Sequence, residues 1–174
     1  MAKNSRFLGK NRSKMLIYGY HAALAALKNP DRRVEKAIIT QEFSNKIEKK
    51  LLSRIDNIQI VSKKDFNRLY QGKNDNLQGV VLEAYYTINV TLTDMLSKNF
   101  NKILIMLDQI QDPQNIGSIM RSAAIFGCNY IISSNNNSPD LNSTIIKSSS
   151  GAAEIVNYIK VQNLVRTISE IKKY

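Results

Sequence analysis

A short apolar run that leads into a polar turn and then a helix is the feature that most constrains the fold of this chain. Residues 103–107 are uniformly apolar and end at Asp108, a pattern that predicts a buried strand. Residues 116–126 then place apolar side chains on one face of a helix. Because ligands of open α/β sheets bind beyond the carboxyl ends of the strands, we expect the chemistry of the chain in this turn and helix.

Strand and helix patterns alternate along the chain in two blocks, which predicts an α/β protein. The first block predicts helices at 20–27, 45–54 and 63–70 and strands at 34–40, 58–61 and 79–84. The second predicts helices at 91–97, 116–126, 141–147 and 163–172 and strands at 102–108, 130–132 and within 155–161, a rhythm typical of a parallel sheet. We expect a basic flexible arm at 1–14, a small domain at 15–86, a linker with a short helix at 87–101 and a second domain at 102–174.

The charge of the chain favours a polyanionic partner. Lysine and arginine number 25 against 14 acidic residues, a net charge of +11. Such an excess indicates nucleic acid first and an acidic membrane second, and a basic cellular background with solvated lysines is the alternative. The N-terminal arm has no acid, and its candidate RNA contacts are Lys3, Arg6, Lys10, Arg12 and Lys14. The alternative for the arm is a disordered, solvated tail.

Composition excludes several classes of site. Cys128 is the only cysteine, which excludes an internal disulfide and a thiolate metal cluster, and His21 is the only histidine, which excludes a multi-histidine metal site. No apolar run approaches the length of a transmembrane helix, and the basic N-terminus lacks the apolar segment of a secretory signal. We therefore expect a cytoplasmic protein without a metal or a membrane partner.

The helix after the polar turn carries the candidate site. Either Asp112 or Asn115 can cap its N-terminus. Gly117 lies four residues before Arg121, so it clears space beside the arginine for a ligand or another backbone. Arg121 points away from the apolar face, where its guanidinium can hold a phosphate through two hydrogen bonds. The alternative is a capped surface helix with a solvated arginine.

Two segments of the second block, the run of small residues at 147–154 and the turn and helix at 112–123, together resemble motifs of a known family. A run of small residues, Lys147 to Glu154, permits close backbone approach or forms a plain loop. The turn and helix read Asp112-Pro113-x-Asn115-x-Gly117-x-x-x-Arg121-Ser122-Ala123. Together these resemble motifs of the SpoU (TrmH) class of RNA ribose 2'-O-methyltransferases, in the SPOUT superfamily. Residues 17–22 and 78–81 resemble the opening and close of the small L30e-like substrate-binding domain, and the resemblance is strongest to the 23S rRNA guanosine 2'-O-methyltransferase branch.

The resemblance implies a function and roles for residues. S-adenosylmethionine would donate a methyl group to a ribose 2'-hydroxyl of ribosomal or transfer RNA. Asn115 and Arg121 would be catalytic, with Arg121 positioning the hydroxyl and stabilising its charge and Asn115 orienting Arg121 or the ribose. Gln78 becomes a further candidate RNA contact. The family resemblance also implies a parallel-sheet domain of the trefoil-knot type and a homodimer.

The family has two further motifs, which form most of the cofactor pocket. Neither motif occurs before Tyr174, the last residue of the sequence, so the resemblance assigns no cofactor-binding residue. We therefore expect an incomplete, C-terminally truncated SPOUT domain with little or no activity as this chain. The alternative function is a non-catalytic RNA-binding module.

Overall fold

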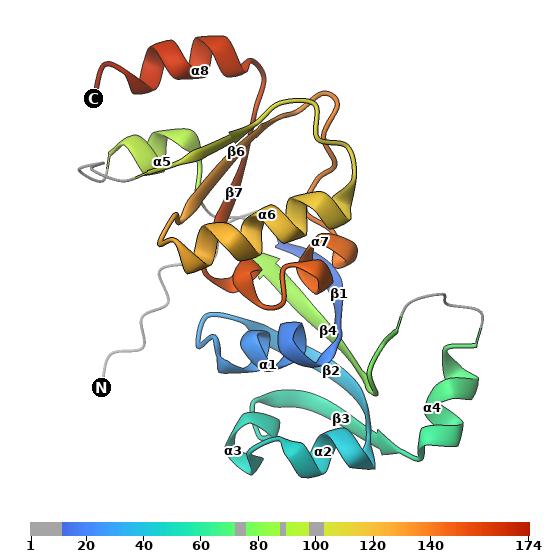
Figure 1. Ribbon diagram of the computed structural model, residues 1–174. Coiled ribbons are helices and arrows are strands. Elements are labelled where there is room, and N and C mark those ends of the chain that lie inside the picture. Colours follow the sequence, from blue (N-terminus) through green and yellow to red (C-terminus); the bar gives the residue numbers. More distant parts are fainter. Residues whose placement is uncertain (1–11, 72–75, 88–89, 98–102) are drawn as a thin grey trace, which may run out of the picture.

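The molecule contains two small sheets with helices packed between them (Figure 1). The computed structural model describes residues 12–71, 76–87, 90–97 and 103–174. The strands are β1 (Arg12–Tyr18), β2 (Arg33–Thr40), β3 (Ile55–Val61), β4 (Val80–Thr87), β5 (Ile105–Leu107), β6 (Tyr130–Ser134) and β7 (Asn157–Val161). The helices are α1 (Tyr20–Lys28), α2 (Gln41–Lys46), α3 (Lys49–Leu52), α4 (Lys63–Leu69), α5 (Leu92–Leu96), α6 (Pro113–Ile125), α7 (Ser143–Ser148), the 3-10 turn η1 (Ala152–Glu154) and α8 (Leu164–Ile171).

The first sheet is mixed, with the strand order β1-β4-β2-β3. β4 pairs antiparallel with both β1 and β2, and only β2 and β3 run parallel. Apolar side chains of α1, α2 and α3 pack on one face of this sheet, and Phe66 of α4 packs on the other with Tyr18 and Val81. The sheet is therefore covered on both faces, which explains why its central strand β4 reads as a nearly continuous apolar run.

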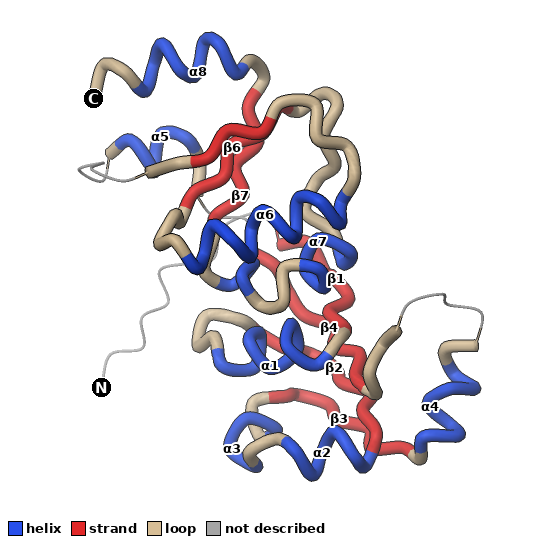
Figure 2. Tube along the Cα trace, in the orientation of Figure 1, coloured by secondary structure: helices blue, strands red, loops and turns tan. Residues whose placement is uncertain are grey.

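The second sheet confirms the predicted parallel arrangement. Its order is β5-β6-β7, and both pairs are parallel. Successive residues of β6 face opposite sides: Ile131 packs with the core that includes α6 and α7, whereas Ile132 packs with the cluster that includes α5 and α8. Figure 2 shows these helices on either side of the red strands. The parallel sheet thus directs its carboxyl ends toward the turn before α6.

Two predictions from the sequence are wrong. The residues expected to form a helix at 45–54 instead span the end of α2 and the short helix α3, because Ile47 adopts an extended conformation and buries its side chain in the core. The sequence patterns do not predict β1. This strand includes residues 12–14, which the sequence analysis places in the flexible arm. Only the second half of β1 is apolar, so the strand depends on its pairing with β4 more than on its own pattern. Residues 1–11 of the expected arm lie outside the described residues.

A buried ion pair joins the two sheet units. Arg32 precedes β2 and Glu154 ends η1, and their Nη2 and Oε2 atoms lie 2.8 Å apart with side chains only 6% and 7% exposed. The same carboxylate oxygen accepts a hydrogen bond of 2.6 Å from Asn29, and Arg32 donates to the carbonyl oxygen of Tyr85 at 2.9 Å. The charges are therefore paired where water cannot solvate them, which makes the loss of either partner costly.

Two glycines allow helices to touch across the same region. A Cβ atom at Gly117 of α6 would lie 1.9 Å from Ser148 Oγ and 2.9 Å from the Ile145 carbonyl oxygen. A Cβ at Gly151, whose φ is +96°, would lie 2.7 Å from the Cβ of Ala25 in α1. The small-residue segment is therefore a close-packed junction rather than a plain loop, and the space beside Gly117 is taken by α7, not by a ligand.

We predict that Glu154→Gln lowers the free energy of unfolding by about 3 kcal/mol, because it leaves the buried Arg32 charge without its counter-charge. Urea denaturation followed by circular dichroism measures the change. The matched control is Asp56→Asn, which breaks the exposed Arg33–Asp56 pair, whose side chains are 62% and 50% exposed; this substitution should cost less than about 1 kcal/mol. Equal losses for the two substitutions would contradict the prediction.

We also predict that Gly117→Ala destabilises the chain by about 2 kcal/mol, because the added methyl group overpacks the α6–α7 contact. The neighbouring Ser118→Ala, at an exposed position of the same helix, should change stability by less than about 0.5 kcal/mol. Thermal unfolding of both variants tests this difference, and an unchanged midpoint for Gly117→Ala would show that α7 yields without cost.

Candidate functional site

The turn after β5 leads into α6, and the N-terminus of this helix is capped. The strand ends at Leu107, and Gln109 in the turn adopts a positive φ of 58°. Asp112 is the cap: its Oδ1 accepts a hydrogen bond of 2.9 Å from the backbone amide of Gln114, and Pro113 takes the first helical position. Since Asp112 fills the capping role, the exposed side chain of Asn115 is left for a ligand.

Arg121 is the exposed cation of α6. Within the described part of the chain it takes part in no hydrogen bond or ion pair, whereas the opposite face of the helix buries Ile116, Met120 and Ala123. Packing therefore fixes the helix but does not use the guanidinium. A side chain of this kind can bind an anion without breaking an internal contact.

The two predicted catalytic residues share a helix but do not touch. No hydrogen bond joins Asn115 and Arg121 among the described residues. Their separation of six residues corresponds to about 9 Å along the axis and about 120° around it. A ligand that contacts both must therefore lie across the helix surface, and the proposed orientation of Arg121 by Asn115 stays a prediction.

Of the five candidate RNA contacts near the N-terminus, two lie among the described residues and three do not. Lys14 Nζ lies 3.1 Å from Glu35 Oε2 and 2.8 Å from Glu83 Oε2, and these hydrogen bonds raise the pKa of the Lys14 ammonium. Its charge is therefore balanced within the sheet. Arg12 lies in β1, and Lys3, Arg6 and Lys10 lie outside the described residues.

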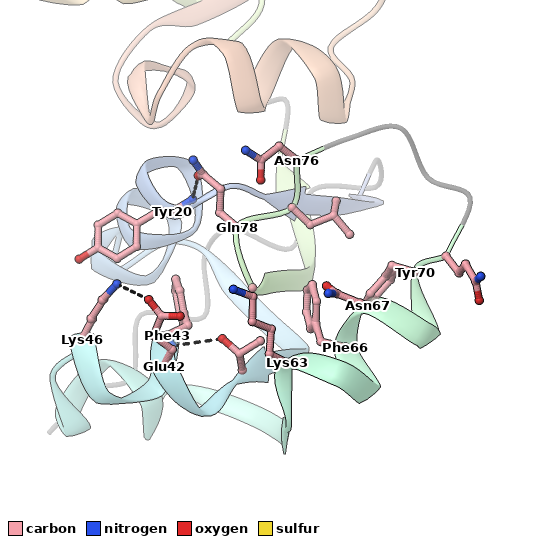
Figure 3. Close-up of a pocket in the computed structure, with 14 residues that line it drawn as sticks. Tyr20, Glu42, Phe43, Lys46, Lys63, Phe66, Asn67, Tyr70, Asn76 and Gln78 are labelled. Atoms are coloured by element: carbon pink, nitrogen blue, oxygen red, sulfur yellow. Dashed lines mark hydrogen bonds and ion pairs between the residues drawn. The ribbon is translucent and has the colours of Figure 1, made fainter.

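Gln78 lies at the rim of a cavity of about 640 Å³ in the first sheet unit (Figure 3). Its Oε1 accepts a hydrogen bond of 2.6 Å from the backbone amide of Tyr20. A Cβ at Gly19 would lie 3.4 Å from both Gln78 Oε1 and Lys147 Cγ, so residues of the two units meet here. Lys147 also places its ammonium 5.4 Å from the ring centroid of Tyr18, a cation–π distance.

Sequence reasoning missed this cavity because its walls come from four separate segments. They are the start of α1, the end of β2 with α2, α4, and the turn before β4. Two of these segments include stretches that resemble the substrate-binding domain, residues 17–22 and 78–81, but that resemblance does not place them around a cavity. The aromatic residues Phe43 and Phe66 are a further signal, and the sequence alone does not place them together.

A second, smaller cavity of about 340 Å³ lies beside α6. Its lining is apolar except for the hydroxyls of Ser118 and Ser122 and the thiol of Cys128. Among the described residues, no group of three or more His, Cys, Asp or Glu side chains is placed to hold a metal ion. Across the same ranges, no helix is both long and apolar enough to cross a membrane.

Tyr174 lies just beyond α8, away from both cavities. Its side chain is 77% exposed, and its backbone amide donates a hydrogen bond of 3.1 Å to the carbonyl oxygen of Ile171. It lines neither the cavity near Gln78 nor the one beside α6. The structure therefore adds no cofactor-binding residue at this end of the described chain.

Family models match both sheet units. The model described as the SpoU rRNA Methylase family matches residues 102–174, and the model described as RNA 2'-O ribose methyltransferase substrate binding matches residues 16–85.

Individual relatives agree with these matches. The 23S rRNA (guanosine-2'-O-)-methyltransferase RlmB of Neisseria meningitidis is 36% identical over 164 residues, which cover 91% of this chain and 65% of the relative. The enzyme of the same name from Ralstonia nicotianae is 30% identical over 167 residues, or 94% of this chain and 67% of the relative. The chain thus spans about two thirds of the length of these relatives.

Solved structures show the same fold at low sequence identity. The SpoU methyltransferase AviRb of Streptomyces viridochromogenes, solved in complex with AdoMet, superposes with a TM-score of 0.68 at 18% identity, covering 92% of this chain and 60% of that one. An rRNA methyltransferase from Sinorhizobium meliloti gives a TM-score of 0.69 at 16% identity, covering 92% and 58%. Sequence and fold agree, and the chain belongs to the SpoU family of RNA methyltransferases.

Proposed function

We propose that the chain serves in transfer of a methyl group from S-adenosylmethionine to a ribose 2'-hydroxyl of ribosomal or transfer RNA. The observation that carries the proposal is Arg121, an exposed arginine without a partner among the described residues, on a capped helix beyond the carboxyl ends of a parallel sheet. Membership of the SpoU family supports the same activity. In this proposal residues 15–86 hold the RNA and residues 102–174 present Arg121 to the reacting nucleotide.

The chemistry assigned to Arg121 follows from its charge. A guanidinium stays protonated in proteins, so it does not act as an ordinary base toward the hydroxyl. It can instead hold a phosphate next to the reacting ribose through two hydrogen bonds and stabilise negative charge that develops on the 2'-oxygen. Holding the ribose in one orientation removes much of the entropic barrier to methyl transfer. Asn115 offers an amide donor and acceptor for the same ribose.

The described residues around α6 do not by themselves fit S-adenosylmethionine. The cofactor carries a sulfonium, an ammonium and a carboxylate, which need charged or carbonyl partners. The cavity beside α6 offers two serine hydroxyls and a thiol on an apolar wall, with no charged side chain. S-adenosylmethionine is therefore the methyl donor in the proposed reaction, but we assign no described residue to its binding.

The proposed partner is RNA, held through phosphate contacts that the net charge of +11 favours. The substrate-binding family match and the names of the relatives support this assignment. A homodimer belongs to the same proposal as an expectation from the family resemblance, and a cytoplasmic location belongs to it as an expectation from the sequence patterns.

Arg121→Ala tests the catalytic part of the proposal. We expect at least a hundredfold lower rate of methyl transfer to ribosomal RNA from radiolabelled S-adenosylmethionine, a loss typical of removing one charge-stabilising donor. Arg166→Ala, which removes an exposed arginine from α8, is the matched control and should leave the rate unchanged. If the parent chain binds RNA but transfers no methyl group, the non-catalytic RNA-binding function is favoured instead.

The affinity for RNA should depend steeply on salt. Neutralising about six phosphates releases enough counterions to weaken binding about a thousandfold between roughly 50 and 200 mM salt. Fluorescence anisotropy with a labelled ribosomal RNA fragment measures this slope. A flat response would contradict RNA binding in either its catalytic or its non-catalytic form.

A further inference from the structure

The cavity in the first sheet unit has an aromatic floor. Phe43 and Phe66 are each 3% exposed, so packing holds their rings in place. Tyr20 contacts Phe43 edge-on with ring centroids 5.7 Å apart, and Tyr70 contacts Phe66 at 5.0 Å. The two tyrosines are only partly buried and lie on opposite sides of the cavity in Figure 3. The buried phenylalanines hold the two tyrosines in place, and the exposed parts of Tyr20 and Tyr70 are the surface of this floor on which a flat ligand can stack.

Polar groups with both donor and acceptor character surround this floor. The amide of Gln78 is anchored through its oxygen to the Tyr20 backbone, and its Nε2 donor has no partner among the described residues. Asn67 and Asn76 add exposed amides to the lining. Amides of this kind can pair with the donors and acceptors on the edge of a nucleobase.

The backbone that carries Gln78 is strained. Gln78 has a φ of +53°, a region that a residue other than glycine adopts at a cost of about 1 kcal/mol or more. The next residue, Gly79, has a φ of +74°, and a Cβ there would lie 2.5 Å from Thr40 Oγ1. The Gly79 carbonyl oxygen accepts a hydrogen bond of 2.9 Å from the Thr40 amide. The surrounding contacts therefore fix the Gln78 side chain at the rim.

The cavity also has a cation that is not committed to an internal ion pair. Lys46 lies 2.7 Å from Glu42 Oε1, which raises the pKa of Lys46 and lowers that of Glu42. Lys63 is exposed and forms no hydrogen bond or ion pair within the described residues. Its ammonium is therefore available to a phosphate at the mouth of the cavity.

We propose that this cavity binds one unpaired nucleotide of the RNA substrate. The base stacks on the aromatic floor, the amides of Gln78 and Asn67 contact its edge, and Lys63 holds a flanking phosphate. A base that is paired and stacked inside a duplex cannot enter the cavity, so the site selects a loop or bulge. This inference rests on the proposed RNA function and adds to it a nucleotide subsite separate from the helix that carries Arg121.

The test uses an RNA hairpin with 2-aminopurine in its loop and the same hairpin with 2-aminopurine in its stem. We expect the full chain to quench the loop reporter as the base stacks on the aromatic floor, and to leave the stem reporter unchanged. Tyr70→Leu keeps an apolar contact with Phe66 but removes a stacking surface, and it should weaken loop binding about tenfold. Circular dichroism of each variant verifies the fold.

Lys63→Ala and Lys64→Ala form a matched pair, because both remove one exposed lysine of α4 and only Lys63 lines the cavity. We expect Lys63→Ala to weaken binding of the loop hairpin about fivefold more than Lys64→Ala. Equal effects of the two, or equal responses of loop and stem reporters, overturn the nucleotide subsite while the RNA function stands. If the chain binds neither hairpin at low salt, both the subsite and the proposed function are overturned.

Discussion

The buried contact between Arg32 and Glu154 is the interaction on which the arrangement of the molecule depends. It ties the start of β2, a central strand of the first sheet, to the turn that precedes β7, the last strand of the second. Oε2 of Glu154 accepts three hydrogen bonds from Asn29 and Arg32, whereas the buried Oε1 has no hydrogen-bond partner among the described residues. Buried charges tolerate few alternative geometries, and this pair therefore specifies how the two units meet as well as joining them.

Close packing around glycines extends this junction to the candidate site. Gly117 lets α6 lie against α7, and Gly151 lets the following turn lie against α1. The apolar core is accordingly continuous from the first sheet to α6. Arg121 is exposed, but the helix that carries it is held by buried contacts on its other face and by a cap at its start. An exposed arginine on a fixed helix suits the proposed binding of a large, charged substrate.

In the proposed function, the two sheet units supply different groups for contact with RNA. The second offers an uncommitted guanidinium on α6, and the first offers aromatic rings, amides and a lysine around a cavity. Gln78 and Lys147 meet at Gly19, so the rim of that cavity lies at the junction of the units. In this proposal, RNA bound by one unit is held at a defined position relative to the other.

The sequence by itself determined the order of most helices and strands, the parallel second sheet and the placement of Arg121 away from the apolar face. It also determined the family. These features depend on local periodicity and on motifs within a few residues. Tertiary structure decided that Asp112 rather than Asn115 is the cap, that Gly117 faces α7, that Ile47 interrupts a helix, and that Lys14 is neutralised by two glutamates. It also paired Arg32 with Glu154, which are 122 residues apart. Such contacts leave no local pattern, since they form only when distant segments pack and exclude water together.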